Sequence, residues 1–202
     1  MSFEKIKPAL ILAAIAAIVS ALCIITYNVT YVDTSGILTE KQAAAAVSIY
    51  GGSAQDYSVV PAEQWSALFA ADEQLSRVTK IIRKSDGSLA FEVVVKGYKE
   101  GFDLLVGVKD GAVAGVAAVS TGEETKDLGT KAAAPEYLER FSGLSGKVTI
   151  VKNEPKNDGE IQAVTGATYS SKGVANAVNI ALGAYGIMQG AQLSAQTGGE
   201  IG

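Results

Sequence analysis

The sequence has no histidine and only one cysteine among its 202 residues. Without histidine, the chain cannot supply a Ser-His-Asp or Cys-His catalytic group, an HExxH zinc site or a histidine ligand for haem. One cysteine excludes an internal disulfide, a structural zinc cluster of several cysteines and a four-cysteine iron–sulfur site. Any redox chemistry must therefore be carried by a cofactor that other residue types hold.

Charged residues are also scarce, at 19% of the chain, and 17 basic against 21 acidic side chains give a net charge of −4. The sequence has no strongly basic patch of the kind that a nucleic-acid partner would require. The hydrophobic content of 48% is high for a soluble protein. This composition predicts a membrane segment.

The apolar excess is concentrated in residues 8–27, which contain no charged side chain. A helix of this length spans about 30 Å, the thickness of the hydrocarbon core of a bilayer. Lys5 and Lys7 precede the run and the next basic residue is Lys41. The positive-inside rule then predicts a single-pass protein of the cell membrane, with residues 1–7 in the cytoplasm and the rest of the chain on the extracytoplasmic side.

A cleaved signal peptide is the alternative interpretation of this segment, since basic residues before an apolar run are typical of both. The run is longer than the hydrophobic part of a typical signal peptide. Bulky Ile24, Ile25 and Tyr27 stand where cleavage would occur. These features favour an uncleaved transmembrane helix.

The remaining chain has the length of one domain. Residues 28–75 are expected to form a tether and a helical lead-in, with helices over 39–50 and 61–74. The second helix is expected to place Trp65, Leu68 and Phe69 on one face. The main domain is predicted over 76–187, and the tail 188–202, rich in Gln, Gly and Ala, is predicted to be flexible.

Within the main domain, the hydrophobic pattern predicts strands joined by hairpin turns, followed by helices. The expected strand pairs are 78–83 with 89–95 and 102–108 with 112–121. Further along the chain we expect a helix over 132–141, short strands over 147–151 and 161–164, and a helix over 170–185. This order predicts an α+β fold, with an antiparallel sheet and flanking helices behind the single transmembrane helix.

Residues 163–173 read Ala-Val-Thr-Gly-Ala-Thr-Tyr-Ser-Ser-Lys-Gly, from a short strand through a tight turn into the last helix. The first N–H groups of a helix have no partner within the helix, and the positive end of its dipole lies behind them, so such a junction favours phosphate binding. Gly166 and Ala167 allow a close approach to the backbone. The alternative is structural, with Thr168, Ser170 and Ser171 serving only as helix caps.

The stretch Thr165-Gly166-Ala167-Thr168-Tyr169-Ser170-Ser171 resembles the S/T-G-A-T-x-S/T-S motif of an FMN-binding domain. This domain occurs in the G subunit of the Rnf complex and in the C subunit of the sodium-translocating NADH:quinone reductase. Residues 96–108 and 137–143 resemble further parts of that family in the same order. Residues 123–129 resemble its E-T-P-G-L-G loop, with Lys126-Asp127 in place of Pro-Gly.

The resemblance implies one FMN, bound covalently through a phosphoester to Thr168. No metal site is expected. No histidine, cysteine or strong base adjoins Thr168 in the sequence. The resembling family uses a separate flavin transferase that takes FMN from FAD, and the resemblance implies the same here. The expected cofactor-binding residues are Thr165, Gly166, Ala167, Thr168, Ser170, Ser171, Glu124, Thr125, Leu128 and Gly129.

The function implied is that of an electron-carrier subunit, without a catalytic acid or base of its own, in an ion-translocating ferredoxin:NAD⁺ oxidoreductase. Its partners are then the other membrane subunits of the Rnf complex. The chain length is closer to the compact Rnf subunit than to the longer quinone-reductase subunit. The alternatives are that quinone-reductase subunit, a free-standing extracytoplasmic flavoprotein, and an anchored adaptor domain without flavin.

Overall fold

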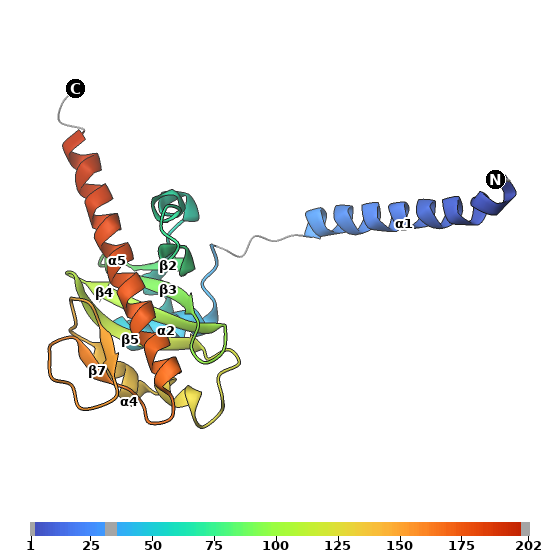
Figure 1. The fold of residues 1–202 in the computed structure, drawn as a ribbon. Helices are drawn as coiled ribbons and strands as arrows, with labels where there is room; N and C mark the ends of the chain where they lie inside the picture. Colours follow the sequence, from blue (N-terminus) through green and yellow to red (C-terminus); the bar gives the residue numbers. More distant parts are fainter. Residues whose placement is uncertain (1–2, 31–35, 199–202) are drawn as a thin grey trace. The chain divides into compact units, whose positions relative to one another are not determined.

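The computed structural model describes residues 3–30 and 36–198 of the chain (Figure 1). The chain divides into two compact units, residues 1–34 and 35–202.

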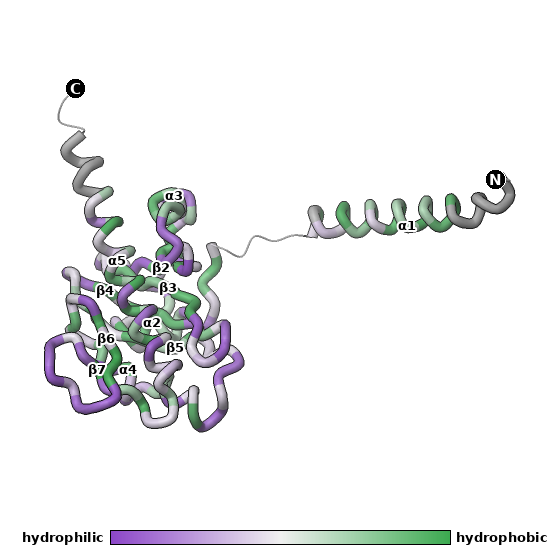
Figure 2. Tube along the Cα trace, viewed as in Figure 1, coloured by the Kyte–Doolittle hydropathy of each residue, from purple (hydrophilic) through white to green (hydrophobic). Residues whose placement is uncertain are grey.

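The first unit consists of helix α1 (Phe3–Thr30). Its window Leu10–Tyr27 has a mean hydropathy of 2.6, and its side chains are exposed. Figure 2 shows apolar residues along the middle of this helix. It is the one helix in the described part of the chain that is long and apolar enough to cross a membrane.

The second unit is built on a five-stranded sheet with the strand order β1-β2-β3-β4-β5, in which every neighbouring pair is antiparallel. The strands are β1 (Tyr57–Val59), β2 (Val78–Lys84), β3 (Leu89–Val95), β4 (Phe102–Lys109) and β5 (Ala112–Ser120). The predicted α+β fold with an antiparallel sheet is confirmed, as are both predicted hairpins.

The β4–β5 hairpin shows how the sequence sets the strand register. Lys109 pairs with Ala112 across a two-residue turn of Asp110 and Gly111, and both turn residues have positive φ, at 52° and 77°. A two-residue turn with positive φ at both positions matches the twist of the flanking strands and favours the Asp-Gly pair found here.

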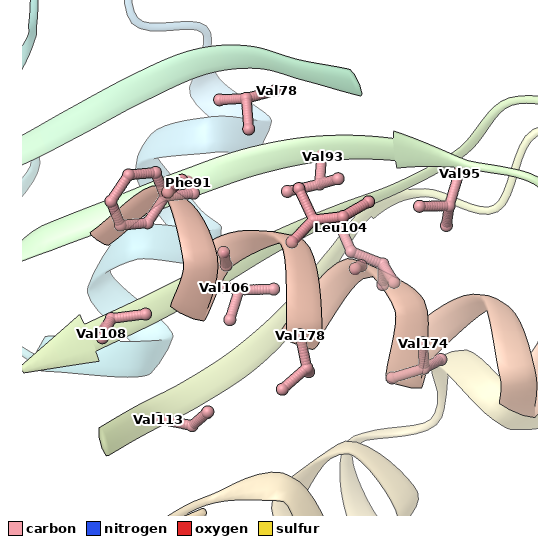
Figure 3. Packing of buried hydrophobic residues seen from close by; sticks show 14 of the residues in the cluster. Val78, Phe91, Val93, Val95, Leu104, Val106, Val108, Val113, Val174 and Val178 are labelled. Carbon is pink, nitrogen blue, oxygen red and sulfur yellow. The ribbon is translucent and has the colours of Figure 1, made fainter. Parts of the chain in front are cut away.

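The two faces of the sheet carry different helices. Helix α5 (Thr168–Gly198) covers one face and α2 (Glu40–Tyr50) packs on the other (Figure 1). On the α5 side, alternate residues of β3 and β4 pack against the helix (Figure 3). The residues labelled there on β3, β4 and α5 are Phe91, Val93, Val95, Leu104, Val106, Val108, Val174 and Val178. On the α2 side, Ala45 and Ala46 pack with Ile82, Ala90 and Leu105.

Two predicted helices are wrong as continuous elements. The segment 61–74 contains only the turns η2 (Ala62–Gln64) and α3 (Ser66–Phe69), and η3 (Leu75–Arg77) follows. Trp65 and Phe69 are buried as expected, but Leu68 is exposed, because α3 ends within one turn.

The segment 132–141 is divided between η4 (Gly129–Ala133), α4 (Pro135–Leu138) and η5 (Glu139–Phe141). Pro135 explains the division, since proline has no N–H for a helix and forces the preceding residue into an extended conformation. Ala134 has that conformation, with ψ at 136°.

The remaining elements lie around the last helix. Strands β6 (Thr149–Val151) and β7 (Glu160–Gln162) form a separate pair that is parallel. The short turn η1 (Ala54–Asp56) precedes β1. Helix α5 extends beyond its predicted end at residue 185, and residues 188–198, for which a flexible tail is predicted, are helical. Gln and Ala, which recur there, are good helix formers. Residues 199–202 of the predicted tail lie outside the described residues.

Candidate functional site

The turn before α5 is shaped by Gly166. The Ala167 N–H donates to the Val164 carbonyl at 2.9 Å, and Gly166 occupies the third position of this turn with a φ of 80°. A positive φ at that position is the mark of a type II turn and favours glycine. A Cβ atom at Gly166 would also lie 2.8 Å from Leu128 Cδ1. The backbone conformation therefore favours glycine here, and any larger residue would also displace the end of the Leu128 side chain.

The first N–H groups of α5 are unsatisfied within the described part of the chain. The helix begins at Thr168, and the preceding residue, Ala167, has no side-chain oxygen to cap it. No described residue accepts a hydrogen bond from the N–H groups of Thr168, Tyr169 or Ser170. These donors and the helix dipole are the elements of an anion site.

The hydroxyls of the turn do not act as caps. Ser170 Oγ donates to Glu124 Oε2 at 2.6 Å, and Ser171 Oγ accepts from the Val164 N–H at 3.0 Å. Thr168 is half-buried, and no described residue hydrogen-bonds its hydroxyl. The capping interpretation of these residues is therefore wrong. Ser170 and Ser171 fix the surroundings, while the Thr168 hydroxyl and the helix N–H groups stay available to a ligand.

A pocket of about 440 Å³ lies beside this helix start. Six of the predicted site residues line it: Thr125, Leu128, Gly129, Gly166, Ala167 and Ser170. Thr165 is exposed and Thr168 is half-buried, and neither is among the lining residues, although the residues that flank Thr168 are. The loop over 123–129 and the helix start, 37 or more residues apart in sequence, thus contribute to one pocket.

Two lining residues were missed by the sequence reasoning, namely Tyr98 and Tyr169. Tyr98 lies in the glycine–tyrosine stretch between β3 and β4, and Tyr169 occupies the unspecified position of the T-G-A-T-x-S-S motif. The available signal was that each tyrosine adjoins a stretch already associated with the site.

Glu124 supports the pocket from behind. Its carboxylate is buried and accepts hydrogen bonds from the Lys99 N–H at 2.9 Å and from Ser170 Oγ. A Cβ atom at Gly97 or Gly129 would collide with its two carboxylate oxygens. Glu124 therefore joins three segments of the chain, and the two glycines make room for it.

The loop over 123–129 keeps a left-handed residue despite its unusual sequence. Asp127, which stands where the related motif has glycine, has a φ of 62°. Aspartate is among the non-glycine residues that tolerate this region. The Asp127 N–H donates to Thr130 Oγ1 at 3.1 Å, and the Leu128 N–H donates to the Thr125 carbonyl at 3.2 Å. The loop thus presents Leu128 to the pocket without the Pro-Gly pair.

The residues present fit a ligand such as FMN. The volume lies within the range of small-molecule pockets. Leu128 and the two tyrosines supply a largely apolar wall, and the unpaired N–H groups of α5 suit a phosphate. Among the described residues, no group of His, Cys, Asp and Glu side chains is suited to hold a metal ion.

A pair of acidic residues, Asp103 and Glu92, lies away from the pocket, on the α2 face of the sheet. Burial and the neighbouring Glu92 carboxylate raise the pKa of Asp103 to about 7. Glu92 itself accepts hydrogen bonds from Gln42 Nε2 at 2.7 Å and from Thr79 Oγ1 at 3.3 Å. This pair belongs to the packing between the sheet and α2.

Comparison with known proteins connects this pocket to a family. Residues 97–183 match the FMN-binding domain family. Over 190 residues, the chain is 28% identical to the G subunit of the Na(+)-translocating ferredoxin:NAD(+) oxidoreductase complex of Acetobacterium woodii, an alignment that covers 89% of this chain and 90% of that protein. The resemblance indicated by the motifs is confirmed.

A solved structure, that of the C subunit of the Na(+)-translocating NADH-quinone reductase from Parabacteroides distasonis, is 20% identical. The match has a TM-score of 0.41 and covers 54% of this chain and 60% of that one. The region matched to the FMN-binding domain family contains both the 123–129 loop and the turn before α5.

Proposed function

We propose that this chain is the FMN-carrying, electron-transferring G subunit of a membrane-bound, ion-translocating ferredoxin:NAD⁺ oxidoreductase. The similarity to such a subunit extends over nearly the whole chain, and the match to the FMN-binding domain family falls on the residues that build the pocket. The observation that carries the proposal is the start of α5, where the Thr168 hydroxyl and three backbone N–H groups have no partner among the described residues, beside a pocket of matching size.

Thr168 is the proposed attachment point. A phosphoester to its oxygen would place the phosphate charge at the positive end of the α5 dipole, close to the unpaired N–H groups of Thr168, Tyr169 and Ser170. Gly166 and Ala167 allow the ligand to approach the backbone, and Leu128 supplies apolar surface. When bound, FMN supplies the redox chemistry, and the protein supplies binding and orientation.

Attachment requires a second protein in this proposal. No described side chain hydrogen-bonds the Thr168 hydroxyl, and the Glu124 carboxylate is already engaged with Ser170 and Lys99. No described residue therefore places a base in contact with the nucleophile. A flavin transferase would supply that base and use FAD as donor. The Thr168 oxygen forms the new bond to the phosphorus of the FMN moiety, the P–O bond to AMP breaks, and the hydroxyl proton leaves.

Helix α1 is the proposed membrane anchor. Its apolar window matches the thickness of the bilayer, and Lys5 and Lys7 precede it in the sequence. By the positive-inside rule, the pocket domain is then extracytoplasmic. An anchored domain of this kind passes electrons to and from other membrane subunits, which we propose as its partners.

The test is flavin attachment in cells that also produce a flavin transferase. The wild-type chain should give a fluorescent flavin band on a denaturing gel, and Thr168→Val should abolish it, because valine keeps the shape of threonine without its hydroxyl. Thr149→Val, at an exposed threonine of β6, is the matched control and should keep the band. A band that persists in Thr168→Val would refute the attachment site. Co-purification with other integral membrane subunits tests membership of the complex.

A further inference from the structure

Large apolar side chains gather unusually at the mouth of the pocket. Tyr98 is 59% exposed, Tyr169 is 67% exposed and Leu128 is 43% exposed, and all three line it. In the rest of the described second unit, the large apolar side chains with comparable exposure are Ile37, Leu68 and Ile187. Exposed aromatic rings forgo the free energy of burial, so a cluster of them around a pocket indicates a surface that a ligand or partner covers.

The two tyrosines form a defined pair, although they come from different parts of the fold. Their ring centroids lie 6.5 Å apart, with a tilt of 58° between the rings. The Nζ atom of Lys99 lies 5.9 Å from the centroid of the Tyr98 ring, a cation–π distance that favours one orientation of that ring. Tyr98 precedes β4, whereas Tyr169 lies in the first turn of α5.

Glu124 connects the backbone segments that carry the pair. Its two carboxylate oxygens accept hydrogen bonds from the Lys99 N–H and from Ser170 Oγ. Lys99 directly follows Tyr98, and Ser170 directly follows Tyr169. A single buried side chain is thus bonded to the residue after each tyrosine.

A close backbone approach makes a second connection between the same segments. A Cβ atom at Gly173 of α5 would lie 3.1 Å from the Lys96 carbonyl oxygen and 3.2 Å from Gly97 Cα. Helix α5 therefore packs directly on the chain just before Tyr98. Together with Glu124, this contact fixes the separation between the backbone segments that carry the two rings.

We propose that Tyr98 and Tyr169 form an aromatic wall that contacts the isoalloxazine ring of the flavin, and that Glu124 is a positioning residue that sets the spacing of this wall. This inference rests on the proposed function, since it requires FMN in the pocket. The isoalloxazine ring is flat and largely apolar, and aromatic side chains bind such surfaces by offset or tilted contacts.

Flavin fluorescence tests the contact directly. A phenol in contact with a photoexcited flavin donates an electron to it, and the electron returns without emission, so that fluorescence is quenched. The experiment uses the full-length chain with attached flavin, in detergent. The variants are Tyr98→Leu, Tyr169→Leu and the double variant, together with Tyr98→Phe and Tyr169→Phe. Leu68→Ala, at an exposed apolar residue of α3, is the control.

Native emission is divided by the emission of the same sample after unfolding and protease digestion, which reports the amount of flavin attached. We expect this ratio to rise severalfold in the leucine variants, most in the double variant, and to stay at the wild-type value in Leu68→Ala. The ratio should also rise in the phenylalanine variants, because a benzene ring keeps the packing of the phenol but is a poor electron donor. An unchanged ratio in the double variant, with flavin attached at the wild-type level, would overturn the contact and leave the proposed function intact. Absence of flavin from the wild-type chain would refute the proposed function instead.

The role of Glu124 is tested with the same ratio. Glu124→Ala removes both hydrogen bonds and should raise the ratio toward that of the tyrosine variants. Glu124→Gln retains an acceptor for the Lys99 N–H and a donor to Ser170 Oγ, and should restore the wild-type ratio. Ser170→Ala, which removes only the bond to α5, provides the same test if Glu124→Ala fails to fold. A wild-type ratio in Glu124→Ala would refute the positioning role. If Glu124→Ala does not fold, a wild-type ratio in Ser170→Ala would refute it instead.

Discussion

The acidic pair under α2 makes the stability of the domain depend on pH in a direction that can be predicted. Asp103 lies on β4 beside Glu92 of β3, and one of its carboxylate oxygens is buried without a hydrogen-bond partner among the described residues. Burial, then repulsion from Glu92, raises the pKa of Asp103 from 3.8 to about 7, while Lys80 acts in the opposite direction. Gln42 and Thr79 donate hydrogen bonds to Glu92 and keep it in place.

Proton linkage determines whether the domain gains or loses stability as the pH rises. Between pH 4 and pH 7, the folded chain holds a proton on Asp103 that the unfolded chain has lost, so the free energy of unfolding falls as the pH rises through this range. The difference between 3.8 and about 7 sets a ceiling of about 4 kcal/mol. Because Asp103 is only partly buried and solvent screens its charge, we expect a loss of about 2 kcal/mol.

Asp103→Asn tests this prediction, because asparagine resembles the protonated carboxyl at every pH. Urea unfolding of the full-length chain in detergent, at pH 4.5 and pH 8, gives the free energies of unfolding. Relative to wild type, Asp103→Asn should be nearly neutral at about pH 4.5 and more stable by about 2 kcal/mol at pH 8. Asp110→Asn, in the exposed β4–β5 turn, is the control and should not change the pH dependence. If Asp103→Asn has the same effect at both pH values, the raised pKa is refuted.

Two further predictions concern the turn before α5. Gly166→Ala places a side chain at a positive φ and against Leu128. It should lower the free energy of unfolding by about 1–2 kcal/mol and reduce flavin attachment. Gly186→Ala, in an open part of α5, is the control and should not lower the free energy of unfolding. Equal stability of the two alanine variants in urea unfolding would contradict the first prediction. Ser171→Ala leaves the Val164 N–H without its acceptor and should lower the free energy of unfolding by about 1–3 kcal/mol in the same assay. Ser145→Ala, at an exposed serine, is the control and should leave that free energy unchanged. A Ser171→Ala stability within error of wild type would show that the Ser171 bond does not hold the turn.

The strands of the main sheet could be predicted because local patterns specify them. In β3 and β4, alternate apolar residues face α5. The Asp110-Gly111 pair closes the β4–β5 hairpin, and both residues have the positive φ that this turn requires. The helical segments were less predictable. Pro135 interrupts 132–141, and α3 ends after one turn although Trp65 and Phe69 have helical spacing.

The pocket was predictable only in part. The residues of the turn and the 123–129 loop were identified from their resemblance to a family, and the structure brings both to one pocket. The aromatic pair of Tyr98 and Tyr169 could not be predicted from the sequence, because its geometry depends on contacts between distant segments. Glu124 bonds Lys99 across 25 positions and Ser170 across 46 positions of the sequence, and no local pattern encodes such connections.

Mass spectrometry of the native chain, purified from cells that produce a flavin transferase, tests the central claim most directly. The account predicts an intact mass that exceeds the sequence mass by one FMN moiety less one water, with the added mass on the peptide that contains Thr168. An unmodified chain, or an FMN on a peptide without Thr168, would contradict it.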